Sequence, residues 1–271
     1  MLTALAGRRS RYERGGTFDV DALAHDLLAN VHFQAVGFAE ADVRAALAAA
    51  APATFPDAMR AVFAAIAAAA GKSRYGDKTP GYVARIPLLA RLFPEARFVH
   101  VIRDGRDSSL SYLDRGYGPR DVAEAAIRWE SRVRRGRADG RDLGPARYTE
   151  LRYEDLVSDP AAALAPVCGF LGLPYAPEML RYHERADQLL AVTRDPERFA
   201  HLAAPPTGGL RDWRTQMAAG DLALFEAIAG RTLAALGYDV VTSRPPIALR
   251  LQAVQRRLAW QRRRLAARFG R

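Results

Sequence analysis

The chain has 271 residues, of which 49% are apolar and 26% are charged, a composition that is ordinary for a globular protein with a sizeable core. No stretch approaches the roughly 18 uncharged apolar residues of a membrane-spanning helix, and residues 1–16 show no apolar signal core, so we predict a cytoplasmic protein. Five scattered histidines and a single cysteine, Cys168, exclude a recognisable metal-ligand motif and an intrachain disulfide.

The net charge of +10 is concentrated at the C-terminus. Residues 240–271 contain nine arginines and no acidic residue, so they account for nine of the ten net positive charges. Leucine and valine recur among these arginines, which predicts an amphipathic helix, and Pro245-Pro246 separates it from the body. We therefore predict a domain over residues 1–243 and a basic helix over residues 244–271. The helix either docks on the body or binds a polyanion or an anionic membrane surface.

The first 70 residues predict mainly helices. Apolar residues recur at helical spacing over residues 19–31, 42–50 and 56–70, and Pro56 suits the first turn of the third helix. A short helix over residues 85–93 ends before Pro94.

Strands and helices alternate after Pro94. Residues 98–102 and 147–153 predict strands, and residues 191–212 predict a long loop. Helices are expected after the first strand and over residues 121–135, 160–171, 177–190 and 220–238. This alternation predicts an α/β fold with a mostly parallel sheet. Two strands are too few for a stable sheet covered on both faces, so we expect the complete sheet to contain more.

Residues 97–112, RFVHVIRDGRDSSLSY, place a basic turn between the first strand and the helix that follows it. Backbone N–H groups at a helix start attract anions, and Arg103 and Arg106 are positioned by the sequence to close over one. This arrangement predicts an anion site at the turn.

Two further residues of the same helix extend this prediction. Ser111 follows Arg103 by eight residues, and Arg115 follows Ser111 at i+4, so both lie on one helix face. The residues alone leave a second interpretation open, in which Arg103 pairs with Asp107 and Ser111 faces solvent.

Six sequence blocks occur in an order that is typical of one enzyme family. They are YGDKTP at 75–80, FPEARFVHVIRDGRDSSLSYLDR at 93–115, LRYEDLVSDP at 151–160, CGFLGLPY at 168–175, GGLRDW at 208–213 and ALGYD at 235–239. Together they resemble the sulfotransferase family, especially its bacterial and protein-tyrosine branch, over more than half of the chain.

The resemblance implies a fold and an activity. The fold is α/β, a P-loop-NTPase-like parallel sheet flanked by helices. The activity is transfer of a sulfuryl group from 3′-phosphoadenosine 5′-phosphosulfate (PAPS) to a hydroxyl or amine of a small molecule, carbohydrate or peptide. The product nucleotide is 3′-phosphoadenosine 5′-phosphate (PAP), and no metal is implied.

The resemblance also assigns roles to particular residues. It implies that Arg103, Ser111 and Arg115 bind the 3′-phosphate and that Tyr153 contacts the nucleotide, although Tyr153 also suits a core aromatic. The protein-tyrosine branch has a lysine just before the tryptophan of GGLRDW, where this chain has Asp212, and Arg211 is the substitute that the sequence offers.

Lys78 is one of only two lysines in the chain. The resemblance implies that it lies near the transferring sulfuryl group, where a cation offsets negative charge on the leaving phosphate. The alternative is a solvated lysine that pairs with Asp77. The small-molecule branch has a histidine base just after this lysine, and this chain has Thr79 and Pro80 instead.

The family's first strand and the loop that wraps the 5′-phosphosulfate have no counterpart that we recognise in this sequence. The catalytic base of the branch follows that loop, and residues 1–40 offer only weak candidates such as Glu13. We therefore expect an N-terminally truncated sulfotransferase sequence, with a non-catalytic PAP(S)-binding or partner-binding relic as the alternative.

Overall fold

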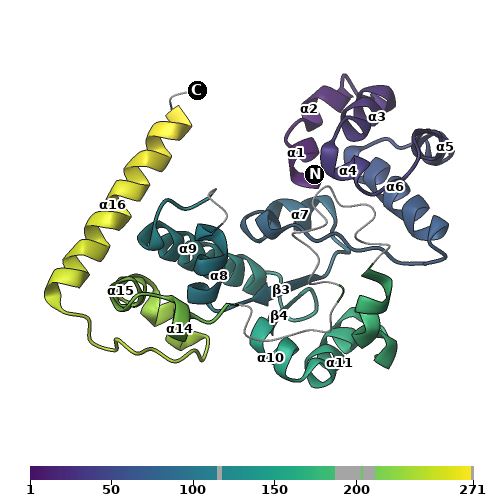
Figure 1. The fold of residues 1–271 in the computed structure, drawn as a ribbon. Coiled ribbons are helices and arrows are strands. Elements are labelled where there is room, and N and C mark those ends of the chain that lie inside the picture. Colours follow the sequence, from purple (N-terminus) through teal and green to yellow (C-terminus); the bar gives the residue numbers. More distant parts are fainter. Residues whose placement is uncertain (115–117, 187–202, 204–210, 270–271) are drawn as a thin grey trace. The chain divides into compact units, whose positions relative to one another are not determined.

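The computed structural model describes residues 1–114, 118–186, 203 and 211–269. The chain forms two compact units, each with its own buried core (Figure 1). The first contains Met1–Ala96 and Arg181–Pro205, and the second contains Arg97–Leu180 and Pro206–Arg271. Among the described residues, every helix is too short or too polar to span a bilayer.

The first unit is mainly helical, and two of its longer helices, α3 and α6, begin where the sequence provides a cap. The Asp19 carboxylate accepts the N–H of Ala22, and the Thr54 hydroxyl accepts that of Asp57. Its elements are α1 (Leu2–Ala6), α2 (Arg9–Tyr12), β1 (Glu13–Arg14), β2 (Thr17–Phe18), α3 (Val20–Leu28), α4 (Val31–Gln34), α5 (Glu40–Ala50), α6 (Phe55–Ala69), the 3-10 helix η1 (Pro80–Ala84) and α7 (Ile86–Leu92).

The helices predicted over residues 42–50, 56–70 and 85–93 are confirmed, and the helix predicted over residues 19–31 is confirmed only as far as Leu28, where α3 ends. The chain turns after α3, because the Asn30 side chain accepts the N–H of His32 and starts α4 instead. Val31, the last apolar residue of the predicted helix, is 47% exposed.

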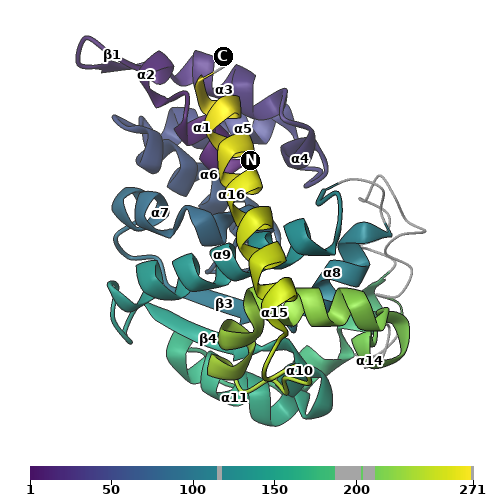
Figure 2. The same ribbon diagram turned by 90° about the vertical axis from the view of Figure 1, so that its left-hand side faces the viewer.

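The second unit is built on a parallel pair of strands, β3 (Phe98–Ile102) and β4 (Tyr148–Arg152). Two helices connect the strands, α8 (Gly105–Leu113) and α9 (Val122–Arg141), and they lie on one side of the pair (Figures 1 and 2). On the other side lie α10 (Tyr153–Ser158) and α11 (Pro160–Leu171). The remaining elements of this unit are α14 (Trp213–Gln216), α15 (Ala219–Ala235) and α16 (Ile247–Phe269). The 3-10 helix η2 (Pro177–Arg185) contains the boundary between the units, which falls after Leu180. This arrangement confirms the predicted α/β class with a parallel sheet flanked by helices.

Two sequence predictions in this unit need correction. The second strand was expected to run to Tyr153, but it ends at Arg152, because Glu154 and Asp155 favour a helix start at this point. The helix expected over residues 177–190 is a 3-10 helix as far as Arg185, and residues 187–190 lie outside the described residues. Most of the predicted loop over residues 191–212 also lies outside them.

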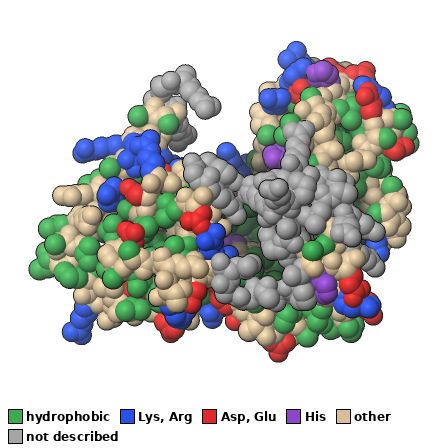
Figure 3. All heavy atoms as spheres, in the orientation of Figure 1, with side chains coloured by type: hydrophobic (Ala, Val, Ile, Leu, Met, Phe, Trp, Pro, Cys, Tyr) green, Lys and Arg blue, Asp and Glu red, His purple; other side chains and the backbone are tan. Residues whose placement is uncertain are grey.

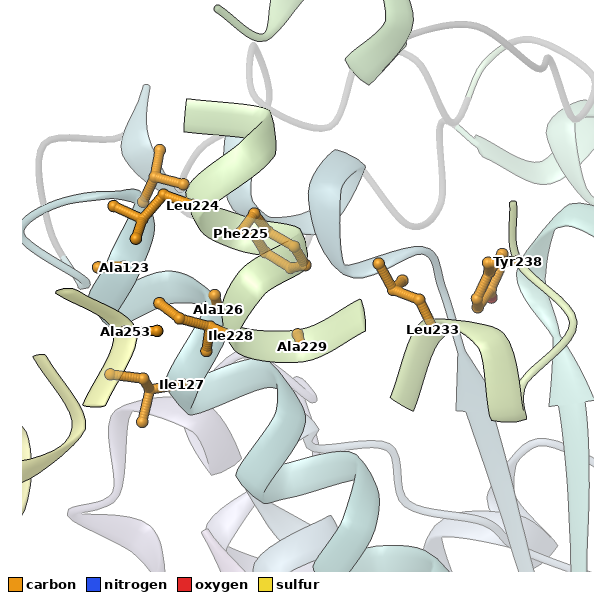
Figure 4. Close-up of a cluster of buried hydrophobic side chains, with 11 residues drawn as sticks. Ala123, Ala126, Ile127, Leu224, Phe225, Ile228, Ala229, Leu233, Tyr238 and Ala253 are labelled. Atoms are coloured by element: carbon orange, nitrogen blue, oxygen red, sulfur yellow. The ribbon is translucent and has the colours of Figure 1, made fainter. Parts of the chain in front are cut away.

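The core of the second unit joins helices that are far apart in the sequence (Figure 4). Ala126 and Ile127 of α9 pack with Phe225 and Ile228 of α15, and Ala253 of α16 completes the cluster. The basic C-terminal helix therefore packs within the second unit. The boundary between residues 243 and 244 stays a prediction.

The turn after β3 is fixed by a buried arginine. Arg106 is 1% exposed, and its guanidinium donates to both carboxylate oxygens of Asp104 at 3.0 and 2.7 Å and to Glu226 at 2.6 Å. Its Cζ atom also lies 3.6 Å from the centroid of the Trp213 ring. A buried charge is tolerated when it is paired and hydrogen-bonded in this way.

A second carboxylate holds the same turn from the side of β4. Glu154 accepts the N–H of Asp104 at 2.8 Å and the hydroxyl of Tyr238 at 2.8 Å. Burial and the hydrogen bond to Glu154 raise the pKa of Tyr238, so its hydroxyl remains a donor. The turn between β3 and α8 is therefore anchored to α10, α15 and the segment that follows α15.

Gly105 allows the turn to lie against α9. A methyl group at Gly105 would lie 2.4 Å from a ring atom of Trp129, which is closer than nonbonded atoms approach. The Trp129 indole N–H donates to the carbonyl of Arg103 at 3.1 Å, so the ring is held in place.

We expect Gly105→Ala to lower the free energy of unfolding by about 1–3 kcal/mol, because the added methyl group overpacks the Trp129 contact. The control is Gly169→Ala in α11, where a methyl group meets open space and the expected change is zero or a slight gain. Urea unfolding of both variants tests this, and equal losses would contradict the packing argument.

We expect Arg106→Met to lower the free energy of unfolding by about 3–5 kcal/mol, because it leaves Asp104 and Glu226 buried without their cation. Arg132→Met on the exposed face of α9 should change it by less than about 0.5 kcal/mol. Chemical denaturation followed by circular dichroism measures both, and similar values would contradict the structural role of Arg106.

Candidate functional site

Arg103 lies where the sequence predicted it, directly after β3 and before α8. The predicted strand, basic turn and helix start are confirmed. Two N–H groups of the turn are already bonded, because the Asp104 carboxylate accepts the N–H of Arg106 at 2.8 Å and Glu154 accepts the N–H of Asp104 at 2.8 Å. The side chain of Arg103 is therefore the charged group that the turn offers to an anion.

The structure brings Arg103 and Tyr153 together. The Arg103 guanidinium lies over the Tyr153 ring, with 4.8 Å between Cζ and the ring centroid. Its side chain is 27% exposed, and its Nε atom is buried without a hydrogen-bond acceptor among the described residues. The stacking fixes the plane of the guanidinium and leaves part of its hydrogen-bonding capacity unused.

Asp107 is the acidic neighbour of Arg103 that the second interpretation invoked. Their closest nitrogen and oxygen atoms are 4.0 Å apart, so the pair is at the limit of an ion pair. The Asp107 carboxylate instead accepts the N–H of Trp213 at 2.9 Å. Burial raises the pKa of Asp107, and the nearby Asp104 carboxylate adds to the effect. Asp107 thus links α8 to the start of α14 and neutralises Arg103 only weakly.

Ser111 is half-buried on α8, one helical turn beyond Asp107 on the same face. Its predicted role in phosphate binding stays a prediction. Arg115, expected one turn further along this helix, lies outside the described residues.

Arg106 does not have the role that the sequence suggested. The motif led us to expect a second arginine closing over the anion, but Arg106 is buried and fully engaged with Asp104 and Glu226. Both carboxylates come from the protein itself, so Arg106 shapes the turn and does not face a ligand.

Arg211 lies near the other end of α8. Its guanidinium is 2.6 Å from the carboxylate of Asp114, the residue that follows the helix. Asp212 caps α14 by accepting the N–H of Arg214 at 3.0 Å. The acidic residue that replaces the lysine of the protein-tyrosine branch therefore has a structural role here.

Lys78 lies in the first unit, on an exposed stretch before η1. Asp77, its expected partner in the alternative interpretation, accepts a hydrogen bond from the Tyr82 hydroxyl. Among the described residues, no carboxylate forms an ion pair with Lys78, which leaves its ammonium group for another anion. Glu13, the weak candidate for a base, instead accepts the N–H of Phe55 and pairs with Arg9.

Two residues make backbone contacts in the site that were not predicted from the sequence. Glu154 and Asp107 bind backbone N–H groups that are 50 and 106 residues away in the sequence, so no local pattern reveals these contacts. The adjacent motifs RYED and RDGRD are the signals that could have drawn attention to them. Within the described ranges, no group of three or more potential metal ligands comes together.

Comparison with known proteins extends this picture. The family model described as "Sulfotransferase family" matches residues 9–177. A Caenorhabditis briggsae protein, assigned by name as a protein-tyrosine sulfotransferase, is 27% identical over 200 residues, which cover 70% of this chain and 70% of that protein. Protein-tyrosine sulfotransferase 2 of Gallus gallus is 26% identical over 62% of this chain and 47% of its own length. An omega-hydroxy-beta-dihydromenaquinone-9 sulfotransferase of Mycobacterium bovis is 31% identical over 39% of this chain and 31% of its own length.

Two solved structures share the fold. The sulfotransferase domain from the curacin biosynthetic pathway matches with a TM-score of 0.52 and 18% identity over 78% of each chain. The sulfotransferase domain from the Synechococcus PCC 7002 olefin synthase matches with a TM-score of 0.53 and 23% identity over 86% of this chain and 80% of that chain. The predicted fold class is confirmed. Because the family model also covers more than half of the sequence, the chain belongs to the sulfotransferase family, whose enzymes transfer a sulfuryl group to hydroxyl acceptors.

Proposed function

We propose that the sulfuryl donor of this enzyme is PAPS and that Arg103 binds the 3′-phosphate of the nucleotide. The observation that carries this proposal is the state of Arg103, which is stacked on Tyr153 and only weakly paired, with an Nε atom that has no acceptor among the described residues. A phosphate would supply the missing acceptor through a charge-assisted hydrogen bond. The donor set of this site therefore fits a phosphate group.

The other proposed nucleotide contacts are arranged around the phosphate that Arg103 binds. Ser111 donates its hydroxyl to the 3′-phosphate from the second turn of α8, and Tyr153 keeps the Arg103 guanidinium in the binding orientation. Arg115 and Arg211 add positive charge near the nucleotide. For Arg211 this requires that it exchange its present partner, Asp114, for phosphate.

PAPS supplies the sulfuryl group, and Lys78 assists its transfer. An exposed ammonium group without a described carboxylate partner is suited to stabilise the charge that develops on the leaving phosphate. The acceptor is a hydroxyl or amine compound, and the small-molecule, carbohydrate and peptide classes all stay open. The bacterial branch of the family and the cytoplasmic location that the sequence led us to expect stay predictions.

We expect Arg103→Ala to weaken PAP binding by about tenfold or more, since a charge-assisted phosphate contact contributes about 1.5–3 kcal/mol. Ser111→Ala should weaken it less, because the lost hydrogen bond is neutral. Calorimetric titration with PAP measures both, with Arg132→Ala on α9 as the matched control for loss of one surface charge. Equal affinity of the wild type and Arg103→Ala would exclude the assigned phosphate site.

We expect Lys78→Met to lower the turnover number for sulfuryl transfer by about a hundredfold while PAP affinity changes little, because the ammonium group acts on charge that develops in the transition state. The assay follows labelled sulfate from PAPS to a panel of phenols, sugars and tyrosine peptides. Lys72→Met, which removes the only other lysine, is the control. Nucleotide binding without turnover by the wild type would favour the non-catalytic alternative.

A further inference from the structure

The C-terminal helix α16 has one face committed to the second unit. Ala253 is buried against α9 and α15, and Leu249 and Trp260 pack beside it. Arg257 on the same side pairs with Glu130 of α9 at 2.5 Å. In Figure 2, α16 runs across the front of the unit with α9 and α15 behind it. The helix is therefore docked, and its orientation about its own axis is set.

The opposite face of α16 is apolar and uncovered. Its large apolar side chains, which are 48–73% exposed, are Ile247, Leu251, Val254, Leu258 and Leu265. At about 100° per residue, these positions fall within a stripe roughly 60° wide. They are five of the eleven large exposed apolar side chains among the described residues. So dense a grouping on one helix face marks an interaction surface.

Arginines border this apolar stripe. Arg250 lies on one side of it and Arg262 on the other, both are exposed, and neither pairs with a carboxylate within the described part of the chain. Figure 3 shows basic side chains gathered over α16. The arginines of the docked face differ, since Arg256 and Arg257 are paired with Asp121 and Glu130. Of these four arginines, the two without a carboxylate partner among the described residues are therefore those beside the apolar stripe.

We propose that this apolar stripe of α16 binds the surface of an anionic lipid bilayer. An amphipathic helix with apolar residues between arginines lies in the plane of such a surface, its apolar side chains among the acyl chains and its arginines on the lipid phosphates. This proposal concerns the attachment of the enzyme to a membrane surface and does not depend on the identity of its sulfuryl donor or acceptor.

Two other occupants fit the surface less well. Residues 240–271 contain no acidic side chain, so a second copy of α16 packed on this stripe would bring arginines against arginines without compensation. A nucleic acid would contact the arginines but would leave the intervening leucines without an apolar partner. A bilayer with anionic headgroups provides phosphates for the arginines and acyl chains for the leucines at the same time.

The test is co-sedimentation of the full chain with vesicles of phosphatidylcholine alone and with vesicles of equimolar phosphatidylcholine and phosphatidylglycerol. We expect binding to the anionic vesicles that weakens as the salt concentration rises. The variant Leu251→Gln/Val254→Gln/Leu258→Gln should reduce this binding at least tenfold. The control Ala259→Gln/Ala266→Gln adds the same polar groups to exposed positions of α16 outside the stripe and should leave binding unchanged.

A second pair of variants tests the charges separately. Arg250→Gln/Arg262→Gln should weaken binding by about fivefold for each arginine removed. Arg132→Gln/Arg134→Gln, which removes two exposed arginines of α9, should have a clearly smaller effect. Circular dichroism of every variant establishes that α16 is retained.

Three outcomes would overturn the proposal. One is vesicle binding that the glutamine substitutions in the stripe leave unchanged. Another is that the wild-type chain does not bind vesicles but forms a concentration-dependent dimer, which these substitutions dissociate. The third is tighter binding to a DNA duplex than to anionic vesicles, with the stripe substitutions having no effect on it.

Discussion

The buried guanidinium of Arg106 is the interaction on which the second unit depends. It is enclosed by Asp104 and Glu226 and covered by Trp213, so a charge that is costly to bury becomes the junction of three chain segments, the turn itself, α14 and α15. Hydrophobic contacts pack α9 against α15, but they do not specify the path of the turn after β3. The ion pairs and the hydrogen bonds of Glu154 specify it, and the position of Arg103 follows from that path.

Two arginines three residues apart therefore have opposite roles. Arg106 is neutralised by carboxylates of its own chain. Arg103 instead stacks on the Tyr153 ring, and the nearby Asp107 carboxylate accepts a hydrogen bond from the Trp213 N–H. This contrast explains how a motif rich in acidic and basic residues can still present one unbalanced positive charge. The acidic residues of the motif are not evidence against anion binding, because Asp104 and Asp107 are both occupied by backbone N–H groups.

The sequence predicted the two strands of the parallel sheet and most longer helices, because apolar periodicity and local caps determine them, but it did not predict β1 and β2. It also predicted that Arg103 and Tyr153 serve one site, and the structure places them in contact. The sequence-based prediction failed where a residue depends on an interaction partner that is remote in the sequence, and where a single polar residue changes the direction of the chain. Asn30 ended a helix that periodicity alone would have continued. The burial of Arg106 could not be predicted, since Glu226, which makes it tolerable, lies 120 residues away in the sequence.

That separation has a consequence for the order in which the protein folds. β3 and the start of α8 leave the ribosome long before Glu226 and Tyr238, which lie 120 and 84 residues beyond their respective partners, Arg106 and Glu154. Closing such long loops is slow, so non-local contacts form late in folding. During synthesis, the turn that carries Arg103 thus stays unanchored until the helix containing Glu226 has emerged and docked, and the phosphate site that we propose at Arg103 is among the last parts of the protein to form.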